Sequence, residues 1–456
     1  MTLNNKYFWK DRLFIKTMLA VALPVAVQFL ISTSINMADT VMISSLGSAE
    51  IAAVGLVNQF VFFFMVATFG FCSAGAVFFS QFYGDRNMEE VRRYLSITLQ
   101  LVTILSLIFT VISLIWSKEI MRLLIPDEEV IFYGAGYLRL IALTFVMTGI
   151  SQALNTVLRS VNRAFEPLLV SIVAFFTNVF FNYIFIFGKL GAPALGVRGA
   201  AVGTIIARFV EIVLLLAFVF FRRPNDHTIK PIEIFAFHKE ILRKFFKIAL
   251  PIIIAEVFWS LGQLMFSVAY ARIGKDATAA VQLTNTIQNL FFILVNAINT
   301  AAAVLIGQSL GANDKDYAKT QASYFISITL MFGLVSTAFL SLLPDLLLKI
   351  YNNLDPAIYQ MARNLLIIRG LFIAFRFLNG MLFVGIFRAG GETKLPLIFE
   401  LLTMWVFAIP ASFIGVLLFK LPVELIFTIV STEELIKFIL IFPLYKKNRW
   451  LKTITH

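Results

Sequence analysis

Residues 22–56 read ALPVAVQFLISTSINMADTVMISSLGSAEIAAVGL, and residues 249–283 read ALPIIIAEVFWSLGQLMFSVAYARIGKDATAAVQL. The second stretch follows the first at an offset of 227 positions, from 22 to 249. Each begins with an apolar run long enough for a membrane-spanning helix, which needs roughly 20 such residues. The same offset aligns further identical residues, namely Gly47 with Gly274, Asn58 with Asn285, Gln81 with Gln308, and Gly84 with Gly311. The sequence therefore predicts a membrane protein built from two related halves.

The composition of the whole chain also indicates a membrane protein. Hydrophobic residues make up 59% of its 456 residues and charged residues only 14%, whereas about a quarter of a typical soluble domain is charged. Apolar runs of spanning length recur from end to end, at residues 14–43, 50–80, 92–117, 133–158, 165–187, 197–221, 244–272, 279–308, 318–344, 358–388, 394–418 and 423–445. We therefore expect an all-α integral membrane protein with twelve transmembrane helices.

The repeat divides these helices into two lobes of six. Because six is even, both halves enter the membrane from the same side, so pseudo-two-fold symmetry along the membrane normal should relate them. Arg159 and Arg388 extend the repeat into the later helices at an offset of 229 positions. The predicted domains are an N-lobe (helices 1–6), a polar cytoplasmic linker, and a C-lobe (helices 7–12) with a cytoplasmic tail, at residues 1–221, 222–243 and 244–456.

The distribution of positive charge predicts the orientation. Lys and Arg concentrate in the segments that share a side with the N-terminus, and cytoplasmic loops carry such an excess. We therefore expect a multi-pass protein of the cell membrane with both termini cytoplasmic. The polar stretch 1–12 leads into an apolar run too long for a cleavable signal peptide.

Residue usage argues against several classes of function. One cysteine, Cys72, and three histidines leave no intrachain disulfide or Cys/His metal cluster. No phosphate loop or nucleophile arrangement is present, so an enzyme and direct use of ATP are not expected. Basic residues in short loops argue against nucleic acid as a partner. Two similar lobes around a cleft instead favour a secondary transporter, a monomer in contact with a small-molecule substrate and membrane lipid; a receptor, channel subunit or scaffold is the alternative.

Four polar residues of the N-lobe lie at about the same depth inside apolar runs: Asp39, Asn178, Asn182 and Thr204. An ionisable group in the membrane is costly and usually functional. A carboxylate flanked by amide and hydroxyl oxygens suits a proton or a hard monovalent cation, so we expect a coupling-cation site here. The alternative is that Asp39 caps a helix end or reaches the headgroups while the other three residues join helices.

A second polar site is expected in the C-lobe, from Glu256, Ser260, Gln263, Asn285, Asn289 and Arg376. Glu256 and Arg376 lie at matching depths, so we predict an ion pair between them, because each would be costly alone. The alternative is that Arg376 reaches towards the cytoplasm and Ser260 and nearby amides bond Glu256. The offset of 227 places Phe29 opposite Glu256 and Phe266 opposite Asp39, so the duplicated fold does not require either acid.

Other intramembrane charges fit local pairs by their spacing. Arg208 and Glu211 are three residues apart, and Lys437 lies within one turn of Glu433 and Glu434. Arg139 and Arg369 have no evident partner.

Three segments together resemble the multidrug and toxic compound extrusion (MATE) family. Residues 22–56 look like its first helix and following loop, residues 178–204 (NVFFNYIFIFGKLGAPALGVRGAAVGT) like its fifth helix to early sixth, and residues 385–396 (GIFRAGGETKLP) like the loop after its tenth. The resemblance covers essentially the whole chain. It implies an exporter of the polysaccharide-flippase superfamily that is driven by sodium or proton entry.

The resemblance also suggests roles for single residues. Asp39 matches the family's first-helix acid of the cation site, Asn178 its fifth-helix Asn, and Thr204 its sixth-helix Thr. Asn182 stands where the family often has Asp, which removes one of two carboxylates. Glu256 resembles a seventh-helix Glu used by other branches, whereas their tenth-helix acid is missing and Arg376 lies in that neighbourhood.

The expected function is therefore a proton- or sodium-coupled antiporter that exports organic cations or amphipathic drugs and metabolites by alternating access. No cofactor is expected apart from a sodium ion at Asp39. The alternative is a flippase of a lipid-linked intermediate, which should need a wide basic cavity for a pyrophosphate. Its candidate residues are Arg139, Arg208, Arg369 and Arg376.

Overall fold

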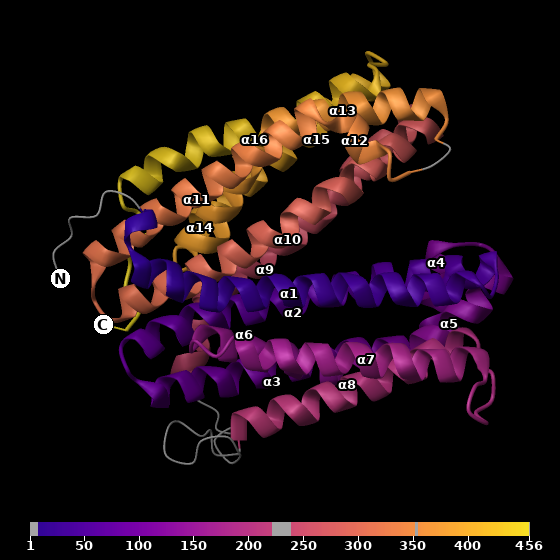
Figure 1. Cartoon of the computed structure of the whole chain (residues 1–456), viewed down its shortest axis with the longest axis horizontal. Coiled ribbons are helices and arrows are strands. Elements are labelled where there is room, and N and C mark those ends of the chain that lie inside the picture. Colours follow the sequence, from indigo (N-terminus) through magenta and orange to yellow (C-terminus); the bar gives the residue numbers. More distant parts are fainter. Residues whose placement is uncertain (1–7, 221–238, 352–353, 456) are drawn as a thin grey trace. The chain divides into compact units, whose positions relative to one another are not determined.

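A computed structural model describes residues 8–220, 239–351 and 354–455, and the elements in this part of the chain are helices (Figure 1). Most of the predicted linker, residues 222–238, lies outside the described residues. The long helices of the first half are α1 (Arg12–Ser44), α2 (Ser48–Gly84), α3 (Met88–Ile115), α5 (Glu128–Ala142), α6 (Phe145–Ser160), α7 (Phe165–Phe187) and α8 (Val197–Phe220). Those of the second half are α9 (Lys239–Ile273), α10 (Lys275–Gly311), α11 (Lys315–Leu342), α13 (Pro356–Gly380) and α16 (Val423–Lys446), and this half also has the shorter helices α14 (Lys394–Glu400) and α15 (Ile409–Leu417).

The observed helices confirm the predicted all-α membrane fold. In the described residues, ten helices are long and apolar enough to cross a membrane, and the bent pair α5–α6 makes an eleventh. Helix α16 completes the predicted set, although it carries the charged residues Glu433, Glu434 and Lys437. Two short helices, α4 (Ser117–Leu124) and α12 (Pro344–Leu348), connect longer ones.

Three of the predicted spans are less regular than expected. The fourth breaks between α5 and α6 with a bend of 49°, and Thr110 of α3 donates a hydrogen bond to the Ala142 carbonyl at this break, at 3.0 Å. The tenth and eleventh contain π-helical segments, η3 (Met381–Phe387) and η4 (Leu401–Ala408). The break between α5 and α6 contains no proline or glycine, so the sequence pattern did not predict it.

The chain divides into two compact units. We call Leu23–Tyr83 with Asn87–Ala249 the N-terminal unit, and Met1–Ala22 with Gly84–Arg86 and Leu250–His456 the C-terminal unit. Two of the boundaries fall one residue before Pro24 and Pro251, the prolines inside α1 and α9. Each of these long helices therefore begins in one unit and continues in the other.

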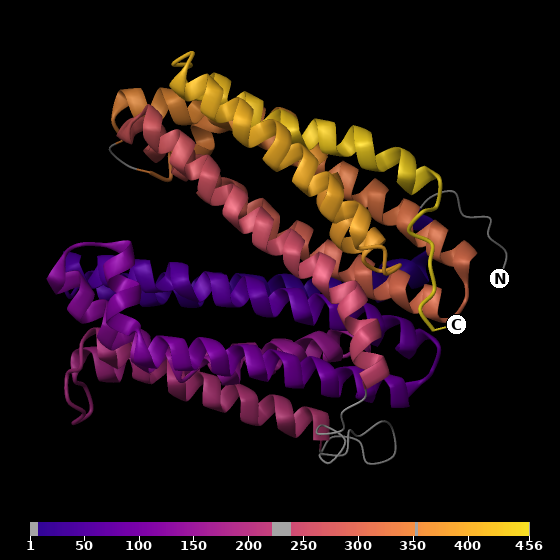
Figure 2. The same cartoon turned by 180° about the vertical axis from the view of Figure 1, so that it is seen from behind.

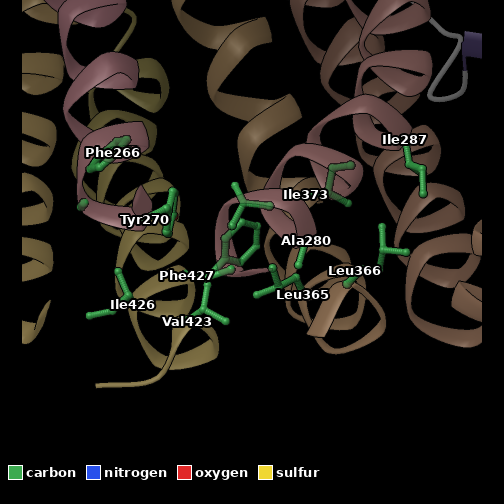
Figure 3. Close-up of a cluster of buried hydrophobic side chains, with 14 of the residues drawn as sticks. Phe266, Tyr270, Ala280, Ile287, Leu365, Leu366, Ile373, Val423, Ile426 and Phe427 are labelled. Carbon is green, nitrogen blue, oxygen red and sulfur yellow. The ribbon is translucent and has the colours of Figure 1, made fainter. Parts of the chain in front are cut away.

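Within the N-terminal unit α7 packs along α8, and within the C-terminal unit α13 packs between α11 and α16 (Figures 1 and 2). Lipid tails are as apolar as side chains, so close van der Waals contact rather than water exclusion holds such helices together. The core of the C-terminal unit shows this packing: Phe427 of α16 lies among Tyr270 of α9, Ala280 of α10 and Leu365 of α13 (Figure 3).

The beginnings of α1 and α9 are firmly packed. Phe14 of α1 is buried in the C-terminal unit, where its ring meets Tyr324 at 5.0 Å and Phe325 at 5.1 Å. Phe245 of α9 is buried in the N-terminal unit and stacks on Phe78 of α2 at 5.8 Å. Aromatic contacts thus fix both exchanged helix starts.

Candidate functional site

The predicted cation site of the N-terminal unit is built on α1, α7 and α8. Asn178 and Asn182 are four residues apart on α7 and therefore share one face. Gly188 ends α7 in the left-handed conformation, with φ of 66°, and α8 then packs back along α7. Gly203 of α8 permits the closest approach, because a Cβ atom there would lie only 2.0 Å from Asn182 Oδ1.

Hydrogen bonds join all four predicted residues in one chain. Asn182 Nδ2 donates to Asp39 Oδ1 at 2.6 Å and to Asn178 Oδ1 at 3.2 Å. Asn178 Nδ2 donates to Thr204 Oγ1 at 3.3 Å. Thr204 in turn donates to the Ala200 carbonyl at 2.9 Å. The structure therefore brings together the four side chains that were predicted from the sequence, from three different helices.

Among these four hydrogen-bonded residues, one buried acceptor atom has no hydrogen-bond partner. Asn178 and Asn182 are buried, whereas Asp39 and Thr204 are half-buried. Asn182 Oδ1 has no hydrogen-bond partner in the described part of the chain. Buried polar atoms normally have partners, and oxygens from carboxylate, amide and hydroxyl groups are the ligands that hard cations take. The donor set therefore fits a small monovalent cation or a proton.

Two neighbours of this site were not selected from the sequence. Tyr137 of α5 is buried and interacts electrostatically with Asp39. Arg208 of α8 also acts on Asp39 through its charge, while its guanidinium contacts Glu211 at 2.5 Å, which confirms the predicted local pair. Arg208 lies one turn beyond Thr204 on α8, and this position could have indicated that it belongs to the site. Its spacing from Glu211 indicated a local ion pair instead.

The predicted ion pair between Glu256 and Arg376 is wrong. Glu256 Oε1 instead lies 2.5 Å from Arg388 Nη2. Arg376 contacts Glu434 of α16 at 3.8 Å and covers the ring of Phe292 at 5.1 Å. Equal depth along two helices does not fix the direction of a side chain, and the tenth helix continues through η3 to place Arg388 on Glu256.

Arg159 makes the corresponding contact in the N-terminal unit. Its Nε and Nη2 atoms donate to Gln28 Oε1 at 3.1 and 2.6 Å, and Gln28 Nε2 donates to Ser171 at 3.2 Å. The structural counterpart of Glu256 is therefore Gln28, one residue before the Phe29 that the repeat offset indicated. The repeated arginines were visible in the sequence, but their partners were not.

The other residues of the predicted C-lobe site do not gather around Glu256. Ser260 is buried, Gln263 and Asn285 are half-buried, and Asn289 is exposed. In the described ranges, no hydrogen bond joins the side chains of these four residues to Glu256. Glu256 with Arg388 and Arg376 with Glu434 are thus separate ion pairs within the C-terminal unit.

Comparisons with known proteins agree on one family. The family model described as MatE matches residues 24–184 and 251–414. A "Probable multidrug resistance protein NorM" from Thermotoga maritima is 26% identical over 410 residues, which cover 89% of this chain and 86% of the relative. An "Uncharacterized transporter YisQ" from Bacillus subtilis is 24% identical and covers 94% of this chain and 93% of its own.

Solved structures share the fold. A MATE structure "in the bent conformation" has a TM-score of 0.87 at 20% identity, with 96% of this chain and 95% of that chain covered. A transporter of the MOP superfamily from Pyrococcus furiosus has a TM-score of 0.86 at 21% identity, with 95% of each chain covered. Identity at this level shows the architecture of two six-helix lobes and leaves the substrate to other arguments.

Proposed function

The chain belongs to the MatE family of membrane transporters, and we propose that it is a cation-coupled antiporter that exports organic cations or amphipathic drugs and metabolites by alternating access. The names of several relatives, multidrug resistance proteins, support the substrate class. The observation that carries the coupling is the hydrogen-bonded chain from Asp39 through Asn182 and Asn178 to Thr204.

The chemistry of this chain suggests how a cation could be sensed. The bond from Asn182 to Asp39 joins α7 to α1, and it is strongest while the carboxylate is charged. A proton or a sodium ion on Asp39 neutralises that charge and competes for the same oxygen. Rotation of the Asn182 amide would then turn its unpartnered oxygen towards the ion. Cation binding would in this way change the contact between two helices of one unit.

The contacts of the candidate arginines do not support the flippase alternative. Three of the four candidate arginines for a pyrophosphate have other contacts: Arg208 contacts Glu211, Arg376 contacts Glu434, and Arg369 lies 4.3 Å above the ring of Phe427. A phosphate would have to displace these partners. We therefore keep drug or metabolite export as the proposed activity.

The proposal is tested with the purified protein in proteoliposomes. Asp39→Asn should abolish gradient-driven efflux of a fluorescent cationic dye while expression and thermal stability stay close to those of the parent. Asp316→Asn is the matched control, because Asp316 is exposed and its side chain contacts Lys319 at 3.2 Å. Full efflux by the Asp39→Asn variant would refute the assignment.

The choice of cation requires separate gradients. A pH gradient and a sodium gradient are imposed in turn, and the one that drives dye efflux identifies the coupling ion. Failure of both gradients would refute cation coupling. Asn182→Asp adds a second carboxylate 2.6 Å from Asp39, and we expect it to change the dependence of efflux on pH or sodium.

A further inference from the structure

The C-terminal unit buries a group of charged residues that the proposed coupling does not use. Lys437 Nζ of α16 lies 2.7 Å from Glu433 Oε1 and 2.9 Å from Glu400 Oε2. The exposed fractions of Glu400, Glu433 and Lys437 are only 7%, 3% and 4%. Three ionisable groups are therefore held together almost out of reach of solvent.

The charges within this group do not balance. One ammonium group can compensate only one of the two carboxylates, so the trio would carry a net negative charge if both acids were ionised. Burial disfavours such a charge strongly. A proton on one of the two carboxyl groups would remove the imbalance.

The neighbouring charged groups do not supply the missing positive charge by contact. Glu434, next to Glu433, is paired with Arg376 of α13 at 3.8 Å. Arg369 of α13 lies above the ring of Phe427, and Tyr270 of α9 faces both arginines and Glu433. In the described residues neither arginine forms an ion pair with Glu400 or Glu433.

Two further observations point to a ligand at Glu400. Its second oxygen, Oε1, is buried and has no hydrogen-bond partner in the described part of the chain, whereas Glu433 Oε1 also accepts a bond from Thr403 at 3.4 Å. Both π-helical segments border the group, because η4 begins directly after Glu400 and Phe383 of η3 lies 5.9 Å from Lys437 Nζ. Such segments often occur at functional sites.

We propose that Glu400 and Glu433 form a proton-binding site in the C-terminal unit, in which the two carboxyl groups share one proton beside a charged Lys437. The proton comes from hydronium in the aqueous phase, and it forms an O–H bond with a carboxylate oxygen while water is released. Sodium does not fit, because the ammonium group already occupies the position between the two acids. The site concerns proton binding itself, so it does not depend on which gradient drives efflux.

Infrared spectroscopy of the purified protein tests this proposal at neutral pH. The parent should show the carbonyl band of a protonated carboxyl group, which shifts in heavy water. Glu400→Gln and Glu433→Gln should each remove that band. Glu434→Gln is the matched control and should retain it, because Glu434 belongs to a separate ion pair with Arg376. A parent without the band, or a band unchanged in both site variants, would overturn the proposal, as would its loss on adding sodium chloride at constant pH.

Isotope labelling keeps the test decisive if a variant does not fold. The parent is produced with carbon-13 at the glutamate side-chain carboxyl, which lowers the frequency of a glutamate band and leaves an aspartate band in place. A shifted band supports a protonated glutamate in the intact protein. An unshifted band would assign the proton to an aspartate such as Asp39 and would overturn the proposal without affecting the proposed efflux.

Discussion

The two halves of the chain carry the same arginine contact with chemically different partners. In the N-terminal unit Arg159 binds the amide oxygen of Gln28, at 2.6 Å from Nη2. In the C-terminal unit Arg388 binds the carboxylate of Glu256, at 2.5 Å from Nη2. Both acceptors lie on long helices that contain a proline, Gln28 on α1 and Glu256 on α9. Both arginines lie near the end of a later helix, which is α6 for Arg159 and η3 for Arg388.

The comparison shows what the repeat requires and what it leaves free. An arginine that reaches back to this helix occurs in both halves, whereas the acid occurs in one, so a neutral acceptor is sufficient for the architecture. A carboxylate makes the contact stronger, since both partners are then charged, whereas the Arg159–Gln28 contact has only one charged partner. It also makes each partner depend on the other, because a buried charge left alone is strongly destabilising.

The largest difference is expected when the arginines are removed. Arg388→Gln leaves the carboxylate of Glu256 in a mostly buried position without its cation, and we expect a loss of about 3–5 kcal/mol in unfolding free energy. Arg159→Gln leaves only a neutral amide, for which the loss should be about 1–3 kcal/mol. Denaturation of the purified variants in mixed detergent micelles measures both values, and equal losses would contradict the comparison.

Glu256→Gln converts the C-terminal contact into a copy of the N-terminal one. An acceptor oxygen remains for Arg388, so the expected loss is about 1–2 kcal/mol, smaller than for Arg388→Gln. The double variant Glu256→Gln with Arg388→Gln should lose less than the sum of the two single variants, because the charges are coupled. Strict additivity in the same denaturation assay would show that the pair is not an energetic unit.

The reverse change is expected to be almost neutral. Gln28→Glu keeps the oxygen that accepts both bonds from Arg159 and adds a negative charge beside it. It loses the bond that Gln28 donates to Ser171, although the serine hydroxyl can donate to the new carboxylate. The gain and the loss should offset each other to within about 1 kcal/mol. Unfolding of this variant would mean that the N-terminal unit excludes an acid at this position.

An exposed arginine–acid pair should show the smallest contribution to stability among the contacts compared. Asp345 of α12 accepts hydrogen bonds from the Tyr359 hydroxyl at 2.8 Å and from Arg363 Nε at 3.0 Å. The tyrosine bond, and then Arg363, hold the pKa of Asp345 below its usual value of 3.8. Because the folded-state pKa is lowered, this contribution is present above pH 3.8 and is lost as the pH falls through the folded-state value.

Asp345→Asn should therefore lower the melting temperature only slightly at neutral pH, and the difference from the parent should disappear in strong acid. The measurement is a thermal melt of both proteins over a range of pH. A change as large as that of Arg388→Gln would show that burial does not set the size of these effects.

Much of this architecture could be predicted because the bilayer restricts the chain severely. Backbone groups in lipid must be satisfied within a helix, so apolar length alone located the spans from α1 to α16. The same restriction makes a polar residue conspicuous, and this is why Asp39, Asn178, Asn182 and Thr204 could be selected before their hydrogen bonds were known.

Pairings across helices were harder to predict. The match of Glu256 with Arg376 relied on depth alone, and the angle around each helix was not known. The alignment of Glu256 with Phe29 assumed a constant offset between the two halves. The contact of Arg159 with Gln28 shows instead that the structural counterpart of Glu256 is one residue before Phe29. Side-chain direction depends on irregular helix segments such as the π-helical η3, which no residue pattern in the sequence predicted.

The exchanged starts of α1 and α9 constrain how the protein can be synthesised. Residues up to Ala22, with Phe14 packed on Tyr324 and Phe325, belong to a unit whose remaining helices leave the ribosome last. The first helix to reach the translocon must therefore wait for α11 before its beginning can be buried. A ribosome that stalls before α9 would release a chain in which Phe78 lacks the ring of Phe245. Neither unit is thus a contiguous stretch that cotranslational folding could complete independently, and chains cut at the linker would have to associate in the membrane to become native.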